Sequence, residues 1–549
     1  MLVDCEVLRQ HKKLLQLFLL LMKAKYILYT LGIAMLSSSC NDFLDEDPKG
    51  KLTPGTFFST QDELTMATYA LYKNVCLTQT NTNPTIPSWL GDDVTANPGS
   101  NKQAYAEIDA FRGSDANKGV EAAWSTSYVV IKAANYIIEN GAKTPTTPEE
   151  INIALGQAKY WRAVHYFWLV RRWGAVPLIL DTEVNYERPL ASIQEIYDQI
   201  VKDLQDCVTT LPTDYSKPPQ KYQGANIFIT KQAAQATLAA VYMAMAGWPL
   251  KQTQYYASAA EQAKAVIDGV NGGTYEYILE PEYKYVYAPS HNYTNETVVG
   301  INFSSAVGTW SEDSQMTNSH LFESLTGWGD ALGEIKFWKE FPSGPRKDAT
   351  YNPKILEGNK EGGKLLDWWD ESIPEQQPMF CAFTISEDGG DYDYTKPANT
   401  SLMTNDHRHR LIRYSEVLLW YAEAQARADG TPNAMAYECI NQVRERAGLE
   451  PLQSGMSGEA FANAALKEHG WEVAGYFVAL VTRRDDQMRM ELLEQAFNER
   501  KANTAIEVAP GVMRKEKVEL PASLTWQGEK SIYLPYPASD TQLNPNLTR

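Results

Sequence analysis

The chain has 549 residues, with 50 Lys or Arg against 68 Asp or Glu, so its formal net charge is −18. Because nucleic-acid binding depends on clustered basic residues, this balance argues against a nucleic-acid partner. The length allows one large domain or several, and the 14 Trp and 31 Tyr suit either a core or flat platforms for sugar rings.

The first forty residues have the pattern of a targeting segment rather than of a folded element. Lys23 and Lys25 precede an apolar run at 26–36, three serines follow, and Cys40 comes next. This order resembles a bacterial lipoprotein signal, in which the cysteine is acylated, although Leu36 stands one place earlier than usual. We therefore predict a signal peptide over 1–39, with 1–21 as an upstream extension, and lipidation at Cys40. A simple secretory signal or an uncleaved anchor is the alternative.

The remaining cysteines after Cys40 are scattered and form no C-x-x-C pair. They are Cys76, Cys207, Cys381 and Cys439. In a chain of this size we interpret them as buried small hydrophobic residues, although four could also form two disulfides. No metal site and no cofactor are predicted.

Apolar residues at helical spacing predict a mostly helical chain. The clearest helix covers 149–173, carries apolar residues on two sides and is stopped by Gly174 and Pro177, so we expect neighbours on both faces. We expect Lys159, Arg162, Arg171 and Arg172 to keep their charged ends in water. The other predicted helices cover 60–76, a segment from Trp124 to Ile138, 192–211, 231–247, 255–269, 411–428, 432–447 and about 458–500.

Pairs of helices joined by short turns, with Ala beside large aromatic residues, are typical of tetratricopeptide-like stacking. The predicted fold is therefore mostly α, an α-solenoid core of helical repeats with an irregular loop-rich lobe and few short strands, one of them at 297–303. A tether is expected at 40–55, the core at 56–270 and 401–531, the lobe at 271–400 and a C-terminal coil at 532–549.

Several separated motifs together resemble the SusD/RagB family, the nutrient-binding surface lipoproteins of Bacteroidetes. They occur in the family's order and extend over nearly the whole mature chain. The residues 468–500 depart from the family pattern, which leaves the packing of the last repeat open. The motifs are Phe43-Leu44-Asp45 with Pro48 and Phe57-Phe58; Tyr128, Ile131 and Asn135; Ala158–Ala163 with Tyr166-Phe167 and Arg172–Leu178; Arg413–Leu419 with Ala422–Ala424; Asn441–Leu449; and Tyr536-Pro537 with Asn544–Leu547.

The resemblance implies a non-catalytic lipoprotein on the outer membrane, exposed at the cell surface. Such a protein binds a glycan and delivers it to a SusC-like TonB-dependent transporter. A glycoside hydrolase on the same surface, a peptide-binding member of the family and a helical adaptor that binds only the transporter are the alternatives.

Two loop regions carry the residue types that hold sugars, namely flat aromatic rings with amides or carboxylates beside them. One is the long loop at 78–119, and the other lies in the lobe. The family draws on these two regions, but its motifs fix no single position there. The candidate ligand-binding residues are Trp89, Asp92, Asp93, Asn97, Tyr105, Trp310 and Trp328; each Trp could instead cover the core beneath its loop.

Other groups that could bind a metal or an anion have simpler interpretations. We read His407-Arg408-His409-Arg410 as a solvated loop and His165 as a core histidine with its hydrogen bonds satisfied. Arg171-Arg172-Trp173 is read as stacking within the solenoid rather than as an anion site. The sequence contains no H-E-x-x-H, G-x-S-x-G, phosphate-loop or dinucleotide motif, so we predict no enzymatic activity.

Overall fold

The computed structural model describes residues 57–549 except 98, 305, 307–313, 402–404 and 549. The predicted signal peptide, Cys40 and the tether therefore lie outside the described residues. Helices make up most of the regular structure, and the strands are short and paired in twos, which confirms the mostly α prediction. In the part of the chain that is described, no helix has both the length and the apolar character needed to span a membrane.

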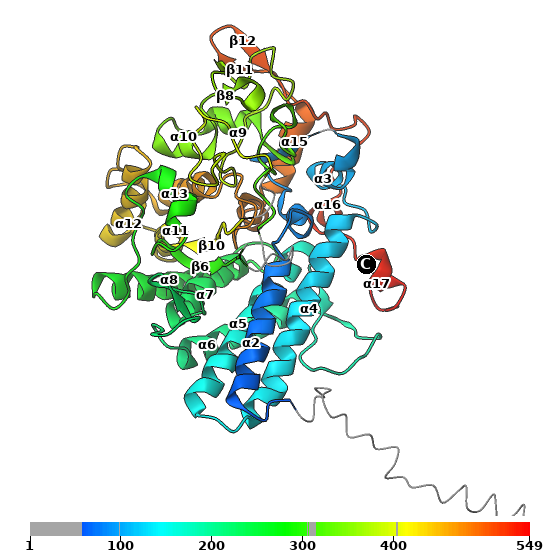
Figure 1. The fold of residues 1–549 in the computed structure, drawn as a ribbon, viewed down its shortest axis with the longest axis vertical. Helices are drawn as coiled ribbons and strands as arrows, with labels where there is room; N and C mark the ends of the chain where they lie inside the picture. The colour runs from blue at the N-terminus through cyan, green and yellow to red at the C-terminus, as the bar shows by residue number, and fades with distance from the viewer. Residues whose placement is uncertain (1–56, 98, 305, 307–313, 402–404, 549) are drawn as a thin grey trace, which may run out of the picture. The chain divides into compact units, whose positions relative to one another are not determined.

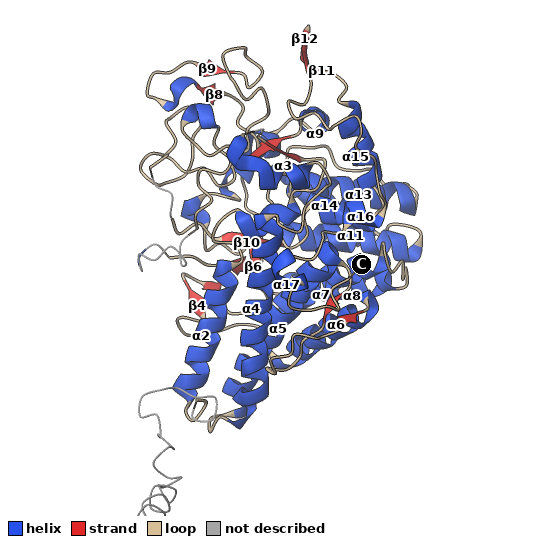
Figure 2. Cartoon of the chain, turned by 90° about the vertical axis from the view of Figure 1, so that its right-hand side faces the viewer, coloured by secondary structure: helices blue, strands red, loops and turns tan. Residues whose placement is uncertain are grey.

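Residues 60–549 form one unit in which successive long helices pack side by side (Figures 1 and 2). Each helix contacts the next in the series α2, α4, α5, α6, α7 and α8, and α8 then contacts α11, which packs on α12 and α13. This is the stacked arrangement that the repeats predict. The bounds are α2 Gln61–Leu77, α4 Lys118–Asn140, α5 Pro148–Trp173, α6 Ile193–Thr210, α7 Lys231–Ala246, α8 Tyr255–Asn271, α11 Tyr414–Asp429, α12 Ala434–Arg446 and α13 Gly458–Glu472.

Helix α5 lies at the centre of this series, between α4 and α6. Thr147 caps its N-terminus by accepting from the amide of Glu150, and Gly174 ends it with a positive φ of 66°. From residue 156 to its end nearly every side chain is buried, as two apolar faces predict.

The expectation that the arginines of α5 reach water is wrong. Arg162, Arg171 and Arg172 are all buried. Arg162 forms a two-pronged ion pair with Asp203 of α6, with both N–O distances 2.8 Å, and Arg171 lies 2.6 Å from Asp485. Carboxylates on neighbouring helices therefore stabilise these charges inside the stack, which the periodicity of α5 alone does not reveal.

Between α8 and α11 the chain runs through short helices, short strands and loops. Because α8 and α11 contact each other directly, this segment leaves the helical stack and returns to it. Figure 2 shows β8 and β9 among loops, well away from the long helices α2 and α5. A cluster of buried apolar residues that includes Trp368 fills this part, and Trp338 and Trp369 pack against it.

The strands form two-stranded antiparallel sheets. The pairs are β1 Val94–Ala96 with β7 Ala331–Gly333, β2 Val176–Pro177 with β3 Leu190–Ala191, β4 Lys221–Tyr222 with β5 Ala225–Asn226, β6 Thr297–Ile301 with β10 His409–Arg413, β8 Ile355–Leu356 with β9 Leu365–Leu366, and β11 Ile506–Ala509 with β12 Val512–Arg514. The shorter helices are α3 Gln103–Asp109, α9 Ile335–Glu340, α10 Pro345–Thr350, α14 Arg483–Arg489, α15 Leu493–Ala502, α16 Glu529–Ile532 and α17 Ala538–Thr541. Strand β6 confirms the strand predicted near 297–303.

The reading of residues 407–410 as a solvated loop is wrong, because all four side chains are buried. His409 and Arg410 belong to β10, and the Arg408 and Arg410 guanidiniums donate to backbone carbonyls of Asn226, Asn292 and His291. Carbonyl acceptors replace water around these charges, so a charge-rich stretch is tolerated in a buried strand.

His165 is buried as expected, but neither ring nitrogen has a hydrogen-bond partner among the described residues. Burial lowers the pKa of His165 to about 3, so the ring is neutral at physiological pH. The four cysteines of the described region are free, with Cys207 and Cys439 buried and the other two partly exposed.

A buried cluster of charged side chains fixes α13, where the sequence departs from the family pattern. Glu472, at the end of α13, contacts Arg346, Arg413 and Arg446 at 2.9, 2.8 and 2.8 Å. Glu468, one turn earlier, lies 2.6 Å from Arg346. Because these arginines come from α10, the start of α11 and α12, the cluster ties the last helices to the lobe.

The C-terminal segment returns to the far end of α5. The indole nitrogen of Trp173 donates to the Pro535 carbonyl at 2.9 Å, and the Tyr536 hydroxyl donates to the Ala175 carbonyl at 2.7 Å. Trp173 and Tyr536 both also pack on Trp124 of α4. The segment predicted as coil, 532–549, thus contains the short helix α17 and covers the end of the central helix pair.

Candidate functional site

A short sheet joins the two loop regions from which the sequence predicts a ligand site. Strand β1 follows Trp89 and Asp92 in the first region, and β7 follows Trp328 in the second. Ala96 pairs with Ala331 and Val94 pairs with Gly333 in antiparallel register. The backbone hydrogen bonds of this pair therefore hold the two loops side by side although they are far apart in sequence.

A cavity of about 590 Å³ opens where these loops meet. Two of the seven predicted site residues line it, Tyr105 and Trp328. The rest of its lining is strongly polar: Asn81, Thr82, Asn83, Asn101, Lys102, Lys118, Gln315, Glu323, Gly327 and Asp330. Its volume lies within the range of small-molecule sites.

The turn that carries Trp328 is fixed by its two glycine neighbours. The Gly327 amide donates to the Phe322 carbonyl at 2.9 Å, and the Gly329 amide donates to the Leu321 carbonyl at 2.8 Å. A Cβ at position 327 would stand 2.2 Å from the Leu321 carbonyl oxygen, and residue 329 has a φ of 54°. Glycine is thus required on both sides, and the turn presents a half-buried indole at the cavity wall.

Tyr105 and Trp89 form successive layers behind the cavity. Tyr105 lines it, and its hydroxyl makes a 2.6 Å hydrogen bond with the hydroxyl of Thr82. Trp89 lies deeper, only 1 % exposed, with ring centroids 4.8 Å from Tyr105 and 4.9 Å from Phe477. Trp89 therefore supports Tyr105 from below and does not line the cavity.

Two lysines line the cavity, one buried in an ion pair and the other exposed. Lys102 is buried and forms an ion pair with Asp330, which also accepts from Thr82 at 3.4 Å. Burial raises the pKa of Asp330, an effect that Lys102 opposes. Lys118 is exposed at the start of α4, and its ammonium lies 5.5 Å from the Tyr105 ring.

Asp92 and Asp93 do not line this cavity. Asp92 forms a two-pronged ion pair with Arg483 at 2.7 and 2.9 Å, and Asp93 is buried and accepts from the Gly475 amide at 2.9 Å. Burial raises the pKa of Asp93 to about 6, and Asp92 contributes in the same direction. Asp92 thus holds the first loop against the start of α14, and Asp93 holds it against the segment that joins α13 and α14.

The last two predicted residues lie differently with respect to the cavity. Asn97 is half-buried beside the turn of Trp328, with its amide nitrogen 3.5 Å from the place of a Cβ on Gly329. Trp310 lies outside the described residues. The structure thus brings Tyr105, Trp328 and Asn97 together, places Trp89 beneath them, and turns Asp92 toward α14 and Asp93 toward the segment before α14.

The residues that sequence reasoning missed are mainly amides and lysines of the first loop. Asn81, Asn83 and Asn101 line the cavity but stand in a stretch of ordinary loop composition. The only local signal is the Thr-Asn-Thr-Asn-Pro run at 80–84. Together with Trp328, these amides supply a flat apolar face and planar hydrogen-bonding groups, the combination that a sugar ring requires.

Comparisons with known proteins agree with the fold. A family model described as "SusD family" matches residues 389–549, and one described as "Starch-binding associating with outer membrane" matches residues 42–243. A SusD-like protein of Bacteroides ovatus is 24 % identical and aligns over 96 % of this chain and 97 % of its own.

Solved structures show the same fold over most of the chain. A SusD homolog from Bacteroides thetaiotaomicron has a TM-score of 0.73 at 20 % identity, covering 90 % of this chain and 97 % of the other. A crystal structure described as "with xylogluco-oligosaccharide" has a TM-score of 0.67 at 21 % identity, covering 88 % of this chain and 98 % of the other.

Proposed function

The chain belongs to the SusD/RagB family, and on that basis we propose that it binds a glycan at the bacterial surface and delivers it to a SusC-like TonB-dependent transporter. It does so as a non-catalytic protein of the outer membrane. The observation that carries this proposal is the cavity in which Trp328 stands among the amides of Asn81, Asn83 and Asn101.

The chemistry of this cavity suits a carbohydrate. The indole of Trp328 offers a flat face for the C–H side of a pyranose, and burying that face removes apolar area from water. The three asparagines offer donors and acceptors to the hydroxyl rim. Because the Trp328 turn is fixed by its glycines and Tyr105 is supported by Trp89, little order must be gained on binding.

Isothermal titration with a panel of neutral oligosaccharides tests the binding step. The panel includes a maltoheptaose and a xyloglucan heptasaccharide. Trp328→Ala is expected to weaken binding at least tenfold, whereas Trp328→Tyr retains most of the affinity because it keeps a flat ring. Tyr186→Ala, which removes an exposed tyrosine outside the cavity, is the matched control. Wild-type affinity in Trp328→Ala would contradict the proposal.

Delivery and anchoring have separate tests. Co-purification of the transporter with the chain is expected from detergent-solubilised outer membrane. Cys40→Ala is expected to release a soluble protein, and membrane retention of that variant would reject the lipid anchor.

Two further measurements separate the alternatives. Release of shorter sugars from an incubated oligosaccharide would favour the hydrolase, and heat with a peptide pool but with no glycan would favour a peptide-binding member.

A further inference from the structure

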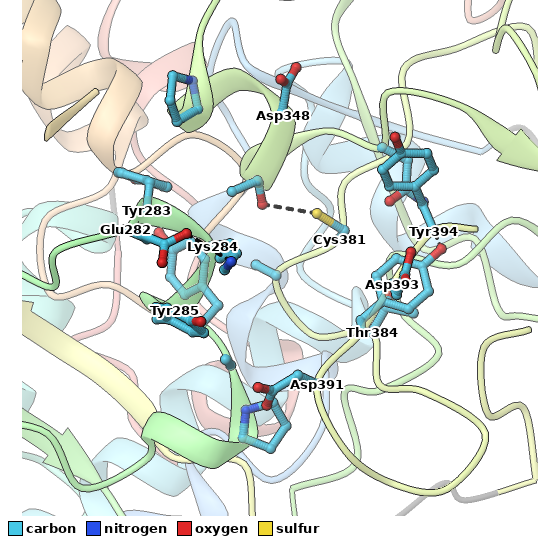
Figure 3. A pocket seen from close by; sticks show the side chains of 18 of the residues that line it. Glu282, Tyr283, Lys284, Tyr285, Asp348, Cys381, Thr384, Asp391, Asp393 and Tyr394 are labelled. Carbon is cyan, nitrogen blue, oxygen red and sulfur yellow. Dashed lines mark hydrogen bonds and ion pairs between the residues drawn. The ribbon is translucent and has the colours of Figure 1, made fainter. Parts of the chain in front are cut away.

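A second cavity, of about 720 Å³, lies in the lobe and shares no lining residue with the cavity of Trp328. Figure 3 shows two walls that face each other across it, one with Tyr283, Lys284 and Tyr285, the other with Asp393 and Tyr394. These walls come from segments about a hundred positions apart in the chain, so the cavity is made by tertiary structure and not by one loop.

The tyrosines of this cavity divide into two sets. Tyr283 and Tyr287 are buried, and both hydroxyls donate to the Glu472 carbonyl at 3.3 Å, so they belong to the frame. Tyr285, Tyr392 and Tyr394 are half-buried and line the open space. The second set therefore reaches the open space, where the Lys284 ammonium also lies 4.8 Å from the Tyr285 ring.

Two of the three half-buried rings, one on each wall, are held in place before any ligand arrives. Tyr285 stacks on His291, with ring centroids 4.3 Å apart and an interplanar angle of 11°. Tyr392 accepts a 3.0 Å hydrogen bond from the buried Asn352 amide. Tyr394 makes no hydrogen bond within the described residues, so its hydroxyl remains to be satisfied by water or ligand.

A polar contact joins the two walls at one end. The Asp391 carboxylate accepts from the Ser290 amide at 2.9 Å and from its hydroxyl at 2.5 Å. Asp391 is labelled at this end of the cavity in Figure 3. Because the contact ties the 289–291 turn to the 391–394 segment, the separation of Tyr285 and Tyr394 is set by the fold.

The charges around the cavity disfavour an anion. Arg446 is occupied by Glu296 and Glu472 at 2.8–3.0 Å, and Lys284 is paired with Glu282 at 2.7 Å. What remains is a single cation and three carboxylates: Lys396 against Asp348, Asp391 and Asp393. A uronate or sulfate group would face this negative excess, whereas hydroxyl groups would find carboxylate acceptors.

We propose that the cavity between Tyr285 and Tyr394 is a second carbohydrate site, selective for neutral oligosaccharide and distinct from the cavity of Trp328. This inference rests on the proposed function for the ligand class, but not on the Trp328 site. Paired aromatic rings with carboxylates at the rim recognise pyranose faces and their hydroxyls in the same way as the first site does with indole and amide.

The test uses the whole mature chain and the stoichiometry of binding. Neutral hexa- and heptasaccharides (maltoheptaose, xyloglucan heptasaccharide, cellohexaose and mannohexaose) are titrated into wild type, Trp328→Ala, Tyr394→Ala and the double variant. Wild type is expected to bind two sugars per chain and each single variant one. The double variant should lose at least tenfold in affinity at both sites. Tyr186→Ala is the control for loss of a surface tyrosine, and unchanged melting temperatures confirm folding.

The outcomes separate the two proposals. Binding that Trp328→Ala abolishes and Tyr394→Ala leaves unchanged would overturn the second site alone. The reverse pattern would overturn the assignment to Trp328 and support the second site. Absence of heat with every neutral sugar would overturn both.

Two further probes test the ligand class. Oligogalacturonate binding that Tyr394→Ala removes would refute selectivity for neutral sugars. Binding of tetralysine that Tyr394→Ala removes, without any sugar binding there, would assign the cavity to cationic peptides and overturn the proposal.

Discussion

Replacing Glu472 by Gln removes one negative charge from the buried cluster that fixes α13. Three guanidiniums contact this carboxylate at 2.8–2.9 Å, and both partners of every contact are at most 4 % exposed. After the change, Arg346, Arg413 and Arg446 share only the carboxylates of Glu296 and Glu468, and one buried positive charge loses its compensation. Removal of one partner from a buried ion pair costs about 3–5 kcal/mol.

The expected size of the effect follows from the chain length. Unfolding entropy is about 2 cal/mol/K per residue, so this chain gains roughly 1 kcal/mol/K in total. The Glu472→Gln variant should therefore melt about 3–5 °C below wild type at pH 7 in scanning calorimetry. Glu491→Gln, which removes an exposed ion pair with Lys251, is the control and should have the melting temperature of wild type.

The pH dependence of this effect has a definite sign. Burial opposes ionisation of Glu472, but the guanidiniums of Arg446, Arg413 and Arg346 outweigh it and hold the pKa well below its usual range. A lowered folded-state pKa gives stability that is present above the unfolded value and is lost as the pH falls. The gap between variant and wild type should thus shrink below about pH 4. This account would be refuted if the Glu472→Gln variant had the melting temperature of wild type at pH 7, or if its loss of stability grew in acid.

Three further changes test other buried contacts. Asp93→Asn should leave stability unchanged near pH 4 and raise it at pH 7, because burial disfavours ionisation of the native carboxyl and raises its pKa to about 6. An equal effect on the melting temperature at both pH values would contradict this. Gly156→Ala should destabilise the protein by about 1–3 kcal/mol, because the new Cβ would stand 2.4 Å from a Leu211 methyl between α5 and α6. A stabilised variant in calorimetry would contradict this steric account. Burial disfavours the charged form of His469, but Asp486 at 2.6 Å outweighs it and raises the pKa to about 9. Wild type should therefore lose stability relative to His469→Gln as the pH rises from about 6.5 to 9, and parallel melting curves over that range would contradict the pairing.

The helices were predictable from sequence because their signals are local. The end of α5 at Gly174, the cap of α6 at Ser192 and the Ala-rich face of α7 all depend on residues within one or two turns. The few strands were harder to predict, because β10 pairs with the distant β6. The buried Arg408, just before β10, and Arg410, within it, donate to carbonyls of distant segments.

The candidate site, like the strands, depends on contacts between segments that are distant in sequence. Trp89 and Trp328 stand in similar surroundings in the sequence, each followed within three residues by Gly and Asp. Trp89 is buried against Tyr105 and Phe477, whereas the turn against Leu321 presents Trp328 at the cavity. Residue type therefore identified the right loops, but which indole faces the cavity was decided by tertiary packing.

The return of the C-terminal segment to α5 sets an order of events during folding. Trp173 and Pro535 are 362 positions apart, and Tyr536 and Ala175 are 361 apart. Local helix pairs form fast, whereas closing so long a loop is slow. Until that closure, the indole of Trp124 lacks its contact with Tyr536 and the indole nitrogen of Trp173 lacks its acceptor at Pro535, so the incompletely folded chain exposes an aromatic surface. Quenching or blue shift of their fluorescence would mark the final step of maturation.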